Sequence, residues 1–122
     1  MKPVPAGEGS TAQFESTDEF LRRVPPIQWN SQEGRVSSAA FTDTRMSVNW
    51  AALSSVQETI AGLDRYGVVS ITAELCWGLK QQIEYTPAQA NHAHCEVVGR
   101  KTKPVRTAFS KGAKLLVRPK LN

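Results

Sequence analysis

Two histidines carry the first candidate chemistry of this chain. They are His92 and His94, the only histidines in 122 residues, and both lie in the stretch 91–95. Imidazole titrates closer to neutral pH than any other side chain, so it can give and take protons during catalysis. Side chains at positions i and i+2 of a strand point to the same face. If this stretch is a strand, the pair can act as catalytic acid and base on a phosphate-containing substrate, such as a nucleotide or nucleic acid.

Histidines at this spacing also suggest a metal ion or a purely structural role. A zinc site needs a third and usually a fourth ligand. Cys76, Glu84 and Glu96 are possible further ligands, but the chain has no Cys-x-x-Cys or His-Glu-x-x-His spacing. We therefore predict no metal and no other cofactor. A two-histidine phosphodiesterase would need a second His-x-Ser or His-x-Thr element, which the sequence lacks, and a structural or solvent-facing pair is the commoner outcome.

An arginine pair early in the chain adds a candidate anion site. Arg22 and Arg23 precede a serine-rich stretch around Ser38. Guanidinium groups bind phosphate and carboxylate through paired, charge-assisted hydrogen bonds. The order Arg22, Ser38, then Glu84 or Glu96 is also loosely analogous to folds that transfer ADP-ribose. The alternative is an arginine pair that is simply solvated.

Basic residues gather at the C-terminal end. The chain has 15 Lys and Arg against 11 Asp and Glu, a net charge of +4 and a pI of about 9.3. Residues 97–122 hold 8 of the basic side chains and no acid, so residues 1–96 sum to −4. The candidate residues for binding an anion, a nucleic acid or a partner are Arg22, Arg23, Arg100, Lys101, Lys103 and Arg106.

The basic segment favours association with an acidic protein surface or with nucleic acid. Phe109 is its only aromatic residue, which argues against stacking on single-stranded bases. Plain solvation stays open, as does neutralisation of the acidic remainder of the same domain.

Several function classes lack their defining sequence. The chain has no Gly-x-x-x-x-Gly-Lys phosphate loop, no Gly-x-Gly-x-x-Gly dinucleotide motif and no Gly-x-Ser-x-Gly nucleophile motif. No apolar run approaches the roughly 18 residues of a membrane span, and no apolar leader is visible at the N-terminus. We expect a cytoplasmic protein without membrane contact, in which Cys76 and Cys95 are reduced, buried thiols.

Local patterns predict the elements that must position these residues. Residues 1–13, rich in Pro, Gly, Ser and Thr, are expected to form a flexible arm. A capping box of Ser16 and Glu19 predicts a short helix that ends before Pro25, with an edge strand over 20–24 as the alternative. Further along, helical spacing of apolar residues predicts a helix over 53–63 with a capping box at Ser55. A short helix over 73–80 follows.

Strand patterns and one more helix complete the chain. Strands are expected at 36–41, 45–50, 67–72, 82–85, 93–99 and 114–118. The first two are expected to pair as a hairpin. Thr102 caps a helix that runs to Gly112. These elements predict a single α+β domain over residues 14–118, with a short mixed β-sheet packed with three to four helices and a C-terminal tail at 119–122.

Four blocks of the chain resemble small hypothetical bacterial proteins. The blocks are residues 20–26, 37–41, 46–49 and 91–102. The resemblance extends over residues 20–112. It implies a bacterial cytoplasmic origin and no particular mechanism.

Two functional hypotheses follow. The leading one is a small bacterial interaction module within a larger assembly, whose basic C-terminal face binds an acidic protein partner or nucleic acid. The rival is a small enzyme or ligand-binding protein for a phosphate-containing substrate, in which His92 and His94 act with arginine or lysine side chains. A shared concave pocket for His92, His94 and Arg22 would favour the rival.

Overall fold

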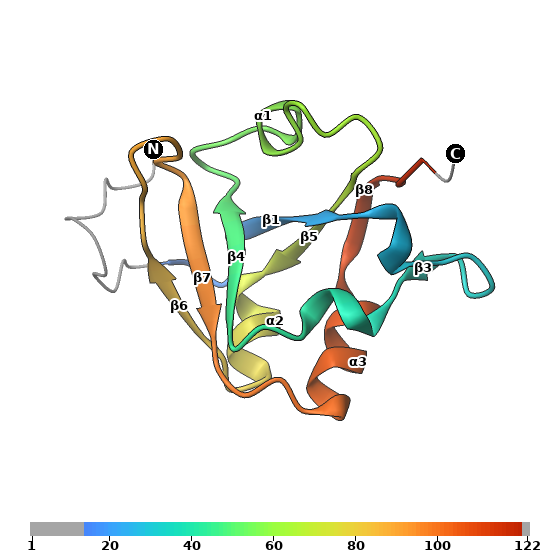
Figure 1. Ribbon diagram of the computed structural model, residues 1–122. Helices are drawn as coiled ribbons and strands as arrows, with labels where there is room; N and C mark the ends of the chain where they lie inside the picture. The colour runs from blue at the N-terminus through green and yellow to red at the C-terminus, as the bar shows by residue number, and fades with distance from the viewer. Residues whose placement is uncertain (1–13, 121–122) are drawn as a thin grey trace.

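An antiparallel β-sheet forms the frame of the molecule (Figure 1). The computed structural model describes residues 14–120, and the arm expected at residues 1–13 lies outside them. The six strands of the sheet, in spatial order, are β6 (Gln82–Tyr85), β7 (His94–Val98), β4 (Arg45–Trp50), β1 (Glu19–Val24), β5 (Gly67–Thr72) and β8 (Lys114–Val117). Two more strands, β2 (Trp29–Asn30) and β3 (Arg35–Val36), pair separately.

The expected α+β class with a mixed sheet is wrong, because the domain is mostly β. All strand pairs are antiparallel. The α-helices in residues 14–120 are short: α1 (Val56–Thr59), α2 (Ala73–Gly78) and α3 (Lys103–Gly112). Two 3-10 turns, η1 (Pro26–Gln28) and η2 (Ser38–Phe41), complete the fold. No helix in this part of the chain is long and apolar enough to cross a membrane.

The first expected helix is a strand. Residues predicted to follow a cap at Ser16 form β1, which pairs with β5 along its full length and with β4 at its start. Asp18 turns inward instead, and its carboxylate accepts a hydrogen bond from the indole of Trp50 at 3.3 Å. A capping box stabilises one helix end by about 1 kcal/mol, whereas a central strand gains ladders on both sides. The edge-strand alternative identified the element and missed its central place.

The helix expected over 53–63 shrinks to the single turn α1. Its capping box is confirmed, since the Ser55 hydroxyl accepts from the Glu58 backbone at 3.0 Å and the Glu58 carboxylate accepts from Ser55 at 2.9 Å. The turn ends at Ile60, and Gly62 follows with a positive φ of 80°. Helical spacing of apolar residues was therefore not sufficient, because the chain leaves helical geometry at Ile60, and the positive φ of Gly62 does not return it to a helix.

The hairpin expected between residues 36–41 and 45–50 is also wrong. Residues 38–41 form the turn η2, which begins where the Ser37 hydroxyl accepts from the Ala39 backbone at 3.1 Å. Strand β4 pairs with β1 and β7 instead. A serine cap followed by small residues suits a tight turn better than a ladder.

The remaining patterns are confirmed as elements. Strands β5, β6, β7 and β8 and helix α2 lie within the expected segments. Helix α3 begins at Thr102, whose hydroxyl accepts from the backbone of Val105 at 3.5 Å. Beyond β8, Pro119 is buried against Gly67, where an added Cβ would collide with it.

The core fills the space between one face of the sheet and α2, α3 and η2. Its largest fully buried side chains include Phe20, Met46 and Trp50 from the sheet. Phe41 of η2 stacks on Phe109 of α3 with ring centroids 5.4 Å apart. In Figure 1, α1 lies at the opposite end of the molecule from α2 and α3.

Both cysteines belong to this core. Cys76 and Cys95 are free and fully buried, as expected for small apolar side chains. Burial raises the pKa of each thiol to about 12. Both therefore stay protonated near neutral pH.

Candidate functional site

Strands β1 and β4 separate after two paired positions. Their ladder ends at Leu21 and Asn49. The Arg22 guanidinium lies in the opening, where Nη1 donates to the Ser47 carbonyl at 2.8 Å. Its Nε and Nη2 donate to the Ala40 carbonyl at 3.2 and 3.0 Å. Arg22 thus takes the place of the missing ladder and fixes the gap between the strands.

Arg22 is committed to the protein itself. Besides these carbonyls, it lies 3.6 Å from the carboxylate of Asp43, and burial lowers its pKa while Asp43 opposes that shift. Arg23, the next residue of β1, is exposed, and its side chain has no hydrogen bond or ion pair with any residue between 14 and 120. Of the two candidate arginines, Arg23 is the one with donors available to a ligand.

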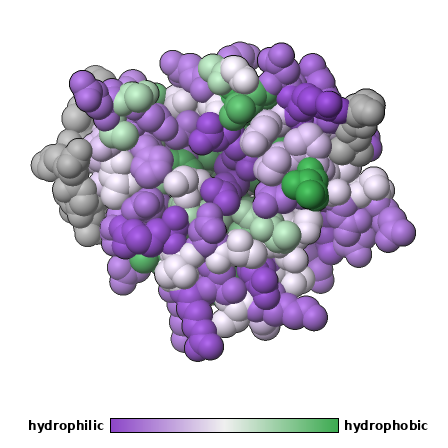
Figure 2. Space-filling view, in the orientation of Figure 1, coloured by the Kyte–Doolittle hydropathy of each residue, from purple (hydrophilic) through white to green (hydrophobic). Residues whose placement is uncertain are grey.

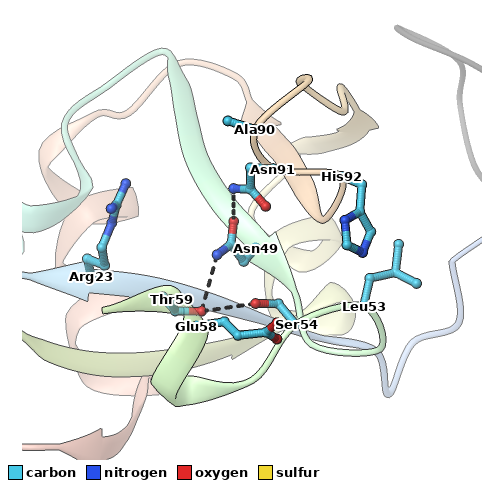
Figure 3. Close-up of a pocket in the computed structure, with 9 residues that line it drawn as sticks. All are labelled: Arg23, Asn49, Leu53, Ser54, Glu58, Thr59, Ala90, Asn91 and His92. Atoms are coloured by element: carbon cyan, nitrogen blue, oxygen red, sulfur yellow. Dashed lines mark hydrogen bonds between the residues drawn. The ribbon is translucent and has the colours of Figure 1, made fainter. Parts of the chain in front are cut away.

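A polar cavity of about 280 Å³ lies beside this gap (Figure 3). Its walls come from β1, β4, the α1 region and the turn before β7. The lining residues are Arg23, Asn49, Leu53, Ser54, Glu58, Thr59, Ala90, Asn91 and His92. Figure 3 shows Arg23 and His92 on opposite sides, with amide and hydroxyl groups between them.

A chain of hydrogen bonds orders the groups between these two side chains (Figure 3). The Asn91 amide donates to Asn49 at 2.8 Å, and the Asn49 amide donates to the hydroxyl of Thr59 at 3.2 Å. Thr59 in turn donates to the Ser55 carbonyl at 2.8 Å. The direction of each donor is set by the next acceptor, so these groups are oriented without a ligand.

His92 lies in the turn before β7 and not in a strand. Its side chain is exposed and has no hydrogen bond to a residue between 14 and 120. Its backbone carbonyl accepts from the Tyr85 hydroxyl at 2.7 Å, which holds the turn in place. The same-face argument for an i, i+2 pair therefore does not apply, because only His94 belongs to the strand.

His94 is held on both sides of its ring. Nδ1 lies 2.8 Å from the carbonyl and 2.9 Å from the hydroxyl of Thr86. Nε2 lies 3.1 Å from the hydroxyl of Ser47. His94 and Ser47 line a second, smaller cavity of about 30 Å³, which shares Arg23 and other wall residues with the larger one. The two histidines thus open into adjoining cavities beside one arginine.

The glutamates near this face are engaged by Arg45. Its guanidinium donates to Glu84 at 2.6 Å and to Glu96 at 2.8 Å, and these bonds raise its pKa. Arg22 donates to backbone carbonyls, and Glu84 and Glu96 bind Arg45. The residues that are loosely analogous to folds that transfer ADP-ribose, Arg22, Ser38 and Glu84 or Glu96, therefore do not form one site.

No group of three or more His, Cys, Asp or Glu that could hold a metal occurs in the part of the chain that the structure describes.

The basic C-terminal segment divides into buried and exposed cations. Lys101 is buried, and its ammonium donates to the carbonyls of Val97 and Gly99 at 3.0 Å and of Thr44 at 3.3 Å. Burial lowers its pKa. Lys101 therefore links the start of β4 to the end of β7 through hydrogen bonds.

The other cations of the segment lie at the surface. Arg106 is half-buried, and its Nε is enclosed without a partner. The exposed ones are Arg100, Lys103, Lys111, Lys114, Arg118 and Lys120. Within residues 14–120, none of the basic groups from Arg100 onward forms an ion pair with a carboxylate. Neutralisation by the acidic remainder of the domain therefore finds no support in these contacts.

Several residues of the site, among them Ser47, Asn49 and Thr86, were not singled out from the sequence. The alternation that predicts a strand over 45–50 also places Ser47 and Asn49 on its outer face, so that signal was present. Thr86 gave no signal, because its contact with His94 depends on how β6 and β7 pair.

The chain matches no model of a protein family, no curated protein and no solved structure.

Proposed function

We propose that this protein binds a small phosphate-containing ligand in the cleft between Arg23 and His92. The observation that carries the proposal is an exposed arginine without a partner among residues 14–120, facing an equally unpartnered histidine across a cavity of about 280 Å³. That volume is close to the lower end for small-molecule sites, which begin at about 300 Å³. It suits a sugar phosphate or part of a nucleotide.

Each group in the cleft has a role in such binding. The Arg23 guanidinium offers a pair of parallel donors to phosphate oxygens. His92 can donate from the opposite wall. The ordered amides of Asn49 and Asn91 present a polar surface to ligand hydroxyl groups. Glu58 adds negative charge at the wall, which favours placing the phosphate near Arg23 and away from α1.

The proposal is tested by titrating the protein with inorganic phosphate and with a nucleoside monophosphate, followed by NMR or calorimetry. We expect Arg23→Gln to weaken binding about tenfold or more, the scale of a lost charge-assisted pair. Arg35→Gln is the matched control, because Arg35 pairs with Glu33 outside the cleft. Equal binding by both variants would exclude the cleft.

A second function is supported by the basic segment. We propose that its exposed cations bind an acidic protein partner or nucleic acid, as a module of a larger bacterial, cytoplasmic assembly. Lys103, Thr107 and Lys111 fall at i, i+4 and i+8 of α3 and form one stripe. Figure 2 shows a surface on which apolar residues form separate spots among hydrophilic ones, so the face in that view is mainly hydrophilic.

This second proposal is tested by salt dependence. Binding to duplex DNA, to RNA and to an acidic peptide is measured between low and physiological salt. The double variant Lys103→Gln/Lys111→Gln should reduce both affinity and the salt slope, since each phosphate contact adds about one to that slope. Lys80→Gln, an exposed cation outside the segment, serves as control. If the protein binds neither DNA, nor RNA, nor the acidic peptide at low salt, this second proposal is wrong.

A further inference from the structure

We propose that Ser47 is a nucleophile activated by His94, and that the pair hydrolyses short-chain acyl esters. The inference goes beyond ligand binding, which needs neither residue to react. It rests on the geometry of a serine, a histidine and a backbone carbonyl in sequence across β4, β7 and the end of β6. A nucleophile, its base and a group that orients the base are the parts of serine catalysis.

The contacts of the imidazole assign its tautomer. The Thr86 carbonyl, 2.8 Å from Nδ1, can only accept a hydrogen bond, so Nδ1 carries the proton of the neutral ring. Nε2 is then the free lone pair, and the Ser47 hydroxyl 3.1 Å away can donate to it. This is the tautomer in which a histidine removes a proton from a serine.

The ring is fixed in this orientation by its neighbour. The Thr86 hydroxyl lies 2.9 Å from Nδ1, and the Thr86 backbone donates to the His94 carbonyl at 3.1 Å. Thr86 and His94 are thus held together by both side-chain and backbone hydrogen bonds. A flip of the ring would lose both contacts at Nδ1.

The backbone of Ser47 is also fixed by hydrogen bonds, and its side chain remains accessible. Its backbone pairs with Glu96 of β7, and its carbonyl accepts from Arg22. Its side chain is exposed, and its hydroxyl has no partner other than His94 in the described chain. The hydroxyl therefore faces an open cavity with its base already in contact.

The reaction is balanced without a cofactor. Ser47 Oγ forms a bond to the acyl carbon while its proton passes to His94 Nε2. The carbon–oxygen bond of the ester then breaks, and the leaving alcohol takes that proton from His94. Water attacks the acyl-enzyme, gives a proton to Nε2 and releases the carboxylic acid, and the proton returns to Ser47. Arg23, which lines the same cavity, supplies positive charge for the oxyanion.

The two cavities limit the substrate. The space of about 30 Å³ beside Ser47 accepts an acyl group of one or two carbons. The adjoining cavity of about 280 Å³ is polar and would hold the alcohol half. The substrate class is therefore a formyl or acetyl ester of a polar, anionic alcohol. Only this identity of the alcohol rests on the proposed phosphate site.

The test uses the full chain, p-nitrophenyl acetate and a small fluorophosphonate probe. We expect one covalent adduct by intact mass and a burst of nitrophenol of one equivalent or less. Ser47→Ala should abolish both, and His94→Gln should slow adduct formation about 100-fold or more. Ser31→Ala, an exposed serine without a histidine contact, is the control and should react like the wild type.

A second pair of variants keeps the test independent of folding defects. Ser47→Cys retains a nucleophile beside His94, whereas Ser31→Cys places one in a plain surface turn. Iodoacetamide at pH 7 should modify the first at least several times faster, because a neighbouring imidazole favours the thiolate. Equal rates for the two cysteines, or an adduct that persists in Ser47→Ala, would overturn the proposal.

The outcomes also separate this inference from ligand binding. If the wild type binds phosphate through Arg23 but forms no adduct, Ser47 is not a nucleophile and the cleft only binds. If Ser47 is labelled but Arg23→Gln binds phosphate as well as the control, the catalytic pair stands without the phosphate site.

Discussion

Two cationic regions of the molecule are built alike and differ in the groups that surround their exposed cations. At the cleft, half-buried Arg22 donates to backbone carbonyls while its neighbour Arg23 is exposed. In the C-terminal segment, Lys101 is buried on three carbonyls while its neighbour Arg100 is exposed. In both regions a structural cation stands next to one that is available to a ligand.

The difference lies in what surrounds the exposed cation. Arg23 shares a concave site with two histidines and an ordered network of amides. Of the cations around α3, Lys103 and Lys111 line an open hollow of about 480 Å³ that contains no histidine and no amide side chain. An enclosed polar site can orient a small ligand at short range, whereas an exposed group of cations acts through charge on a large partner. Net charge alone therefore does not distinguish the two functions.

The largest expected effect separates the neighbours of the cleft. Arg22→Met should lower the free energy of unfolding by about 3 kcal/mol, because the carbonyls of Ala40 and Ser47 lose their charged donor. Arg23→Met should change it by less than about 0.5 kcal/mol, as for most exposed sites. Urea denaturation measures both. Similar losses for the two arginines would mean that Arg22 does not hold the gap between β1 and β4.

The same comparison applies to the C-terminal segment, with a somewhat smaller effect. Lys101→Met should lower the free energy of unfolding by about 2 kcal/mol. Methionine provides a similar apolar stem, so the loss comes from the three carbonyls that no longer have a donor. Lys103→Met should be nearly neutral in stability by the same urea measurement. If Lys101→Met is as stable as the wild type, the buried ammonium is not the link between β4 and β7.

The amide network gives a still smaller effect. Asn49→Leu removes the group that links Asn91 to Thr59, and should weaken phosphate binding about fivefold, close to 1 kcal/mol. The readout is the same phosphate titration. The affinity of the wild type and of Asn49→Leu would be equal if Arg23 and His92 alone determine binding.

The smallest effect is a pH dependence of stability. Burial lowers the pKa of folded Lys101 below 10.5, its ordinary value, so the unfolded chain binds more protons between the two values. The free energy of unfolding contributed by this residue therefore rises with pH in that window and is lost as the pH falls through the folded pKa. Denaturation at several pH values should show this rise in the wild type and not in Lys101→Met. A parallel dependence in both proteins would contradict it.

Much of the local structure could be predicted from sequence. Alternating residues identified β4, and apolar, β-branched runs identified β5 and most of β7. Thr102 marked the start of α3, and Ser55 marked that of α1, because a cap is a local hydrogen bond between near neighbours. The charge division and the two histidines were also evident from residue identity.

Other features could not be predicted from sequence, because they depend on contacts between residues that are far apart in the chain. The segment after Ser16 becomes the central strand β1 because β4 and β5 bind both of its edges, which no local pattern encodes. Likewise, Ser47 and His94 are 47 residues apart and meet only through the register of β4 with β7.

The sequence by itself determined where strands and caps form and where charge collects, since these depend on neighbours in the chain. Only the tertiary structure decided which cations donate to backbone carbonyls, and that Arg23, Ser47 and His94 share a cavity. The physical reason is that burial and hydrogen-bond partners are properties of strand pairing and packing. Arg22 and Arg23 are identical residues at adjacent positions, and the fold alone gives them different roles.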